Sequence, residues 1–113
     1  MEISNTPKPP YYAVIFTSEL NDDSAGYETV SDRMVELVQQ QAGFLGFESA
    51  REAIGITVSY WKDEASILKW SSNLEHQEAQ RLGKEKFYKS YSIRICKVER
   101  AYSFDTVSRV VKF

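Results

Sequence analysis

The chain has 113 residues, a length that fits one domain, and 42% of them are hydrophobic and 13% aromatic. That much apolar surface excludes an intrinsically disordered chain, and the absence of any run of about 18 apolar residues argues against a membrane partner. A net charge of −2 argues against a nucleic-acid partner, and the single cysteine, Cys96, excludes an intrachain disulfide and a cysteine-based zinc site.

The first part of the chain predicts a strand followed by a helix. Residues 1–10 contain three prolines and predict a disordered or extended tail. Residues 11–18 are β-branched and aromatic, which predicts a buried first strand. From residue 27 to residue 41, apolar side chains recur every three to four positions, which indicates an amphipathic helix. Gly43 fits the turn at the end of this helix, because glycine readily adopts a left-handed conformation.

The middle of the chain predicts a hairpin and two short helices. Residues 44–51 and 54–61 resemble strands, and their short connection makes them antiparallel neighbours. Asp63 is a plausible N-cap for a short helix, and Ser72 with Glu75 has the spacing of a capping box that would start the next helix. Side chains alternate along the second strand of the hairpin, and one of its two faces carries Ile54, Ile56, Val58 and Tyr60.

The complete order of elements predicts the fold class. Residues 91–104 form a long fourth strand, and residues 105–113 form an arm or a further short strand. One domain over residues 11–104 with the order β-α-β-β-α-β indicates an α+β, ferredoxin-like fold, in which helices cover one face of a four-stranded antiparallel sheet. The first strand is apolar on both faces, so the other sheet face needs a cover. A homodimer in the form of a dimeric α+β barrel would provide that cover.

The segment GITVSYWKDEASILKWSSNLEHQEAQ, residues 55–80, resembles the antibiotic biosynthesis monooxygenase family of the dimeric α+β barrel superfamily. The matching features are a strand that ends in Tyr-Trp, an acidic helix cap, and Trp70 and His76 on successive short helices. The upstream Gly-Phe-Leu-Gly at residues 43–46 also fits the turn after the first helix of that family. The resemblance implies a cofactor-independent monooxygenase that oxidises a small aromatic or quinol-type metabolite. The substrate would supply the electrons to dioxygen, so no cofactor is expected.

The resemblance and the residue chemistry together give the candidate site residues. His76 is the only histidine and is the candidate catalytic base, because the positive end of a helix dipole keeps an imidazole neutral. A capping or buried structural histidine is the alternative. Trp70 matches a position that often lines the pocket of the family, although its spacing also fits a core tryptophan. Four further candidates for substrate binding, each of which could equally serve packing or surface pairing, are Tyr60, Trp61, Tyr88 and Arg94.

Other functions of the same fold class are less well supported by the sequence. Haem-degrading relatives have an asparagine in the first strand and a histidine further along the helix, whereas this chain has no such asparagine and carries Gln80 at the helical position. The third strand lacks the basic-aromatic motif of RNA-recognition domains. One histidine without paired ligand spacing gives no metal site. A non-catalytic small-molecule-binding module is the open alternative, and the lack of a visible signal peptide leads us to expect a cytoplasmic protein.

Overall fold

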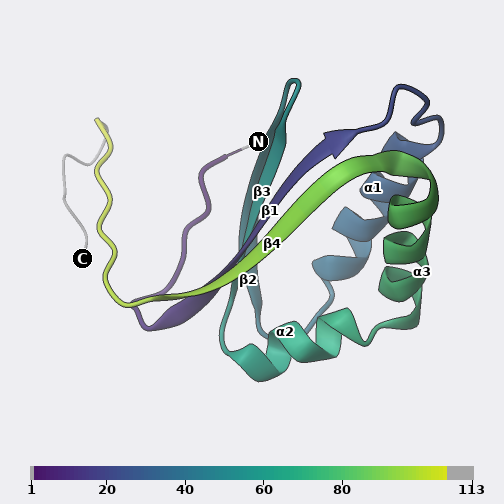
Figure 1. Cartoon of the computed structure of the whole chain (residues 1–113). Coiled ribbons are helices and arrows are strands. Elements are labelled where there is room, and N and C mark those ends of the chain that lie inside the picture. The colour runs from purple at the N-terminus through teal and green to yellow at the C-terminus, as the bar shows by residue number, and fades with distance from the viewer. Residues whose placement is uncertain (1, 107–113) are drawn as a thin grey trace.

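The computed structural model describes residues 2–106 (Figure 1). Within these residues, no helix is both long enough and apolar enough to cross a membrane. The elements follow the predicted β-α-β-β-α-β order, with two short helices and one π-helical turn in the second helical segment. They are β1 (Tyr11–Leu20), α1 (Tyr27–Val38), β2 (Phe44–Arg51), β3 (Gly55–Trp61), α2 (Glu64–Ser71), α3 (Leu74–Leu82), the π-helical turn (Gly83–Phe87) and β4 (Tyr88–Val98).

The four strands form one antiparallel sheet in the order β2-β3-β1-β4. All helices lie on one side of this sheet, as Figure 1 shows. β1 and β3 are the two inner strands, and the β-branched and aromatic residues of β1 suit a strand that is paired along both edges. The prediction of an α+β, ferredoxin-like fold with helices on one face is therefore confirmed.

The strand register divides the side chains between a helix face and an open face. Val14 is opposite Ser59 on β3 and Ile95 on β4, and this row lies on the helix face. The next residue, Ile15, is opposite Val58 and Arg94, so this row lies on the open face. The alternation predicted for the third strand is thus the observed one.

Residues 2–10 lie along the open face at its β2–β3 side. The Ser4 amide donates to Oε2 of Glu48 over 2.9 Å, and its hydroxyl donates to the Phe47 carbonyl over 3.0 Å. The hydroxyls of Thr6 and Tyr11 are 2.8 Å apart and share a hydrogen bond. The prolines keep this segment extended and without helix or strand, but side-chain and backbone hydrogen bonds hold it against the sheet.

The junction between α2 and α3 differs from the prediction. Asp63 caps α2 as predicted, since its carboxylate accepts the Ser66 amide over 2.8 Å. The cap of α3 is Asn73, whose side-chain oxygen accepts the His76 amide over 3.1 Å, and the predicted cap at Ser72 is wrong. Ser72 still belongs to the end of α2, because both its amide and its hydroxyl donate to the Leu68 carbonyl.

The last strand is also shifted from its predicted range of 91–104. β4 follows the π-helical turn directly, and its extent matches that of β1, whose ends Tyr11 and Leu20 are paired with the ends of β4. Apolar residues continue beyond Val98, and for this reason the sequence pattern places the C-terminal end of the strand too far along the chain. Of the predicted C-terminal arm, residues 107–113 lie outside the described part of the chain.

Candidate functional site

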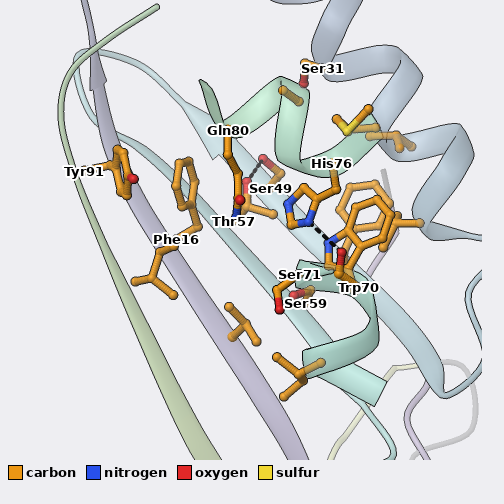
Figure 2. A pocket seen from close by; sticks show the side chains of 18 of the residues that line it. Phe16, Ser31, Ser49, Thr57, Ser59, Trp70, Ser71, His76, Gln80 and Tyr91 are labelled. Atoms are coloured by element: carbon orange, nitrogen blue, oxygen red, sulfur yellow. Dashed lines mark hydrogen bonds between the residues drawn. The ribbon is translucent and has the colours of Figure 1, made fainter. Parts of the chain in front are cut away.

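A cavity of about 780 Å³ lies between the helices and the sheet. Its sheet side comes from all four strands and its helix side from α1, α2 and α3 (Figure 2). The turn before β2 allows α2 to approach closely, because Gly43 has a φ of 83° and a Cβ at this position would collide with Ser66. The apolar part of the lining includes Val14, Phe16, Met34, Ile67, Ile93 and Ile95.

His76 is held at the cavity wall by the start of α3. Its ring Nδ1 lies 2.9 Å from the Trp70 carbonyl oxygen (Figure 2). A carbonyl only accepts, so Nδ1 carries the proton and donates it, and Nε2 carries the lone pair. The ring also stacks on the indole of Trp70, with centroids 4.1 Å apart and planes 13° apart. The hydrogen bond and the stacking together fix both the tautomer and the orientation of the imidazole.

The surroundings of His76 favour its neutral form. Burial lowers the pKa of the imidazole below its ordinary value, because the charged form loses solvation. The hydrogen bond to the Trp70 carbonyl acts in the opposite direction and offsets part of this effect on the pKa. At neutral pH, the ring is therefore an uncharged hydrogen-bond acceptor at Nε2, as a general base requires.

Trp70 and Trp61 both line the cavity, and they form a stack that ends at His76. The two indole centroids are 6.4 Å apart with planes at 28°. Trp61 is almost completely buried, with 1% of its surface exposed, and its Nε1 donates to the Ser59 hydroxyl over 2.9 Å. Trp70 is thus part of the cavity wall, and its ring also supports the imidazole of His76.

Tyr88 lines the cavity at the other end of the sheet from this stack, because it pairs with Leu20 at the end of β1, whereas Trp61 pairs with Tyr12 near the start. Its ring packs edge-on against Phe16 at 5.3 Å and against Tyr27 at 5.8 Å between centroids. Burial is the main cause that raises the pKa of the Tyr88 phenol, so the hydroxyl keeps its proton well above neutral pH. Tyr88 is therefore a wall residue that also carries a protonated hydroxyl.

The structure does not bring Tyr60 and Arg94 to the cavity, and this part of the site prediction is corrected. The Tyr60 hydroxyl donates to Oε1 of Glu48 over 2.5 Å on the open face, where burial and Glu48 raise its pKa to about 12. Arg94 is opposite Ile15 in the register and belongs to the same face. Neighbouring residues of a strand point to opposite sides, so Tyr60 and Trp61 cannot line the same cavity.

A polar strip lies on the β2–β3 side of the cavity, and the sequence patterns above did not predict it. Ser49 on β2 and Thr57 on β3 face each other with their hydroxyl oxygens 2.8 Å apart, and Ser59 follows on β3. Gln80 of α3 also lines this part of the cavity (Figure 2). The alternation of the third strand could have identified Thr57 and Ser59, since both share the face of Trp61. Residues 2–106 contain no group of three or more His, Cys, Asp or Glu side chains that could hold a metal ion.

Comparisons with known proteins agree with this fold. Residues 10–82 match the family described as antibiotic biosynthesis monooxygenase. The uncharacterised protein YqjZ of Bacillus subtilis is 48% identical over 104 residues, which cover 90% of this chain and 91% of that protein. A jasmonate monooxygenase of Pyricularia oryzae is 29% identical over 55 residues, which cover 49% of this chain and 26% of that enzyme.

A solved structure gives the same result for the fold alone. SnoaB, a cofactor-independent oxygenase from Streptomyces nogalater, superimposes with a TM-score of 0.71 at 11% sequence identity. The superposition covers 82% of this chain and 97% of SnoaB.

Proposed function

The chain belongs to the antibiotic biosynthesis monooxygenase family, and on this premise we propose that it is a cofactor-independent monooxygenase acting on a small aromatic or quinol-type molecule. One observation carries the proposal. A neutral histidine with its Nε2 lone pair available lies in the wall of a largely apolar and aromatic cavity. Aromatic walls fit a planar ligand, and a neutral imidazole accepts the proton of a phenolic hydroxyl.

The proposed reaction needs no separate reductant. His76 takes the phenolic proton, and the resulting electron-rich anion passes electrons to dioxygen. One oxygen atom then forms a bond to a ring carbon, and the other leaves as water after that carbon loses its hydrogen. The substrate supplies all the electrons that dioxygen takes up, so 1,4-dihydroxynaphthalene plus dioxygen would give hydroxynaphthoquinone plus water.

The remaining residues of the cavity would bind and shield the anion. A bound substrate would displace water from the apolar lining, which strengthens each remaining polar contact to the substrate. Trp70 keeps the imidazole in place, and Tyr88 contributes an aromatic wall whose hydroxyl is hydrogen-bonded to Tyr27. Both residues therefore position the substrate, and neither takes the proton.

The test measures oxygen uptake with a panel of quinols and polyphenols for wild type and His76→Ala. Loss of a general base typically lowers the rate by about 10²-fold or more, and we expect that loss here. Gln77→Ala is the matched control, because Gln77 is exposed on the same helix, and it should keep the wild-type rate. Full activity of a folded His76→Ala variant would contradict the assignment of the base. If wild type consumes no oxygen above the uncatalysed rate, the non-catalytic binding module becomes the better description.

We also propose that the molecule acts as a homodimer, with a second copy as the occupant of the open face. Ile56 on this face is 46% exposed, and the chain after β4 extends beyond the sheet (Figure 1). This segment carries Tyr102 and Phe104, which are 68% and 62% exposed. A stable obligate interface buries more than roughly 2,000 Å² in total, and the open face together with an aromatic arm can supply such an area.

A further inference from the structure

Gln80 lies one helical turn after His76 on the same side of α3. Residues at this spacing have Cβ atoms about 5–6 Å apart, so their side chains reach neighbouring parts of one ligand. Both residues line the cavity. Figure 2 shows Gln80 extending from α3 toward Ser49 and Thr57, while His76 lies on the side of Trp70.

The Gln80 amide has unused hydrogen-bonding capacity. Among residues 2–106, its side chain makes no hydrogen bond, although the residue is only partly exposed and borders an apolar cavity. The β1–β4 side of the cavity, which includes Phe16 and Ile93, is mainly aromatic and aliphatic, and its polar atoms are the hydroxyls of Tyr88 and Tyr91. A polar group in such a place is stabilised when a ligand brings a complementary atom, because leaving it unpaired in an apolar environment costs free energy.

We propose that Gln80 is a specificity-determining residue that binds a second oxygen on the substrate ring, apart from the hydroxyl at His76. This inference rests on the proposed function and names its substrate class as aromatic molecules with two ring oxygens. A glutamine amide has both a donor and an acceptor, so it can bind a hydroxyl before oxidation and a carbonyl afterwards. The hydroxyl of Thr57, which lines the same cavity and shares a hydrogen bond with Ser49, belongs to the polar strip on this side.

The polarity of the cavity also sets the direction of the ligand. Its oxygen-bearing edge would lie along α3 and the β2–β3 side, where Gln80 and Thr57 are, and its unsubstituted edge against Phe16 and Ile93. A reversed ligand would leave the Gln80 amide unpaired, and this costs free energy.

The experiment measures binding without oxygen, so that it does not depend on turnover. The probes are 1,4-dihydroxynaphthalene, which has two ring oxygens, and 1-naphthol, which has one. Dissociation constants come from quenching of tryptophan fluorescence under anaerobic conditions for wild type, Gln80→Leu and Gln77→Leu. One added hydrogen bond is worth about 5-fold in affinity, so wild type should prefer 1,4-dihydroxynaphthalene by about that factor. Gln80→Leu should remove this preference and leave 1-naphthol binding unchanged, whereas Gln77→Leu should behave as wild type.

The possible outcomes separate this inference from the proposed function. Equal affinity of wild type for the two probes, or equal weakening of both by Gln80→Leu, would overturn the role of Gln80. If the preference is present and depends on Gln80 but no oxygen is consumed, the inference about recognition holds and the monooxygenase proposal fails. If oxygen is consumed and Gln80→Leu leaves the preference intact, the monooxygenase proposal holds and this inference fails.

Discussion

The chemistry of His76 depends on a single hydrogen bond to a main-chain carbonyl. The Trp70 carbonyl accepts from Nδ1, which leaves Nε2 as the basic nitrogen. No side-chain carboxylate is needed to select this tautomer, and the stacking on Trp70 holds the ring plane. A neutral tautomer fixed in this way can take a proton without first being reoriented.

At the residue scale, we expect a specific dependence of activity on pH. Because burial lowers the pKa of His76, the rate constant kcat/KM should rise with pH through an apparent pKa below the ordinary value of about 6.5 and then level off. The measurement is a pH profile of oxygen uptake with 1,4-dihydroxynaphthalene. The acidic limb should be absent from the residual activity of His76→Ala, and its presence there would assign the limb to another group.

The same pKa shift has a consequence for stability that can be checked without a substrate. The folded state binds the His76 proton less readily than the unfolded state, so the unfolded state holds more protons between the two pKa values. Protonation of His76 in the unfolded state therefore lowers the stability of the fold as pH falls through about 6.5. Above that pH, this effect on stability vanishes. Melting temperatures of wild type and His76→Ala should accordingly draw closer in acid if wild type is the more stable at neutral pH.

At the element scale, the junction of α2 and α3 assembles the site from residues that are close in sequence. The Trp70 carbonyl accepts two hydrogen bonds, one from the His76 ring and one from the Asn73 amide, the latter over 3.1 Å. The Asn73 side chain in turn accepts the His76 amide, which starts α3 and sets its direction. Three residues at intervals of three thus link the end of one helix, the start of the next and the candidate base.

We expect Asn73→Ala to destabilise the protein by about 1 kcal/mol, the usual cost of losing an N-cap. For a domain of this size, that corresponds to a melting temperature lower by roughly 4 °C. Ser72→Ala is the matched control, because Ser72 is exposed and outside α3, and it should change stability by less than about 0.5 kcal/mol. Thermal unfolding of both variants measures the two changes in stability. A larger loss of stability for Ser72→Ala than for Asn73→Ala would show that Ser72, as predicted from the sequence, is the N-cap of α3.

At the scale of the whole molecule, the shape is more extended than that of a compact domain. The radius of gyration is 15.2 Å, compared with about 13 Å for a compact chain of this length. The principal extents of 45 × 30 × 22 Å reflect a sheet that is covered by helices on one side and continued by the chain after β4 (Figure 1). The open face and the projecting arm are the two features on which the proposed homodimer rests.

For the proposed dimer, sedimentation velocity at micromolar concentration should show about twice the chain mass of 13.0 kDa. Replacing both arm aromatics, Tyr102→Ser with Phe104→Ser, should shift the equilibrium toward monomer, because the interface loses two large apolar side chains. Leu74→Ser is a suitable control, since Leu74 is even more exposed, at 81%, but lies on the helical layer, away from the open face. A wild-type protein that sediments only as monomer contradicts the assembly.

The sequence by itself determined the elements whose patterns are local. Helix and strand periodicity, the Asp63 cap and the alternation within the third strand predicted the order of elements and the ferredoxin-like class, although not which face of the sheet the helices cover. These features depend on residues a few positions apart, so the local sequence carries them. The resemblance to the family added Trp70 and His76, both of which line the cavity.

Only the tertiary structure decided which residues share the cavity and how His76 is presented to it. Tyr60 and Arg94 lie on the open face, while Gln80, previously noted only as the replacement of a histidine, borders the cavity. The tautomer depends on the distance from Nδ1 to the Trp70 carbonyl, which the junction of two helices sets. Such contacts join separate elements, and no periodicity along a single segment records where another segment will pack.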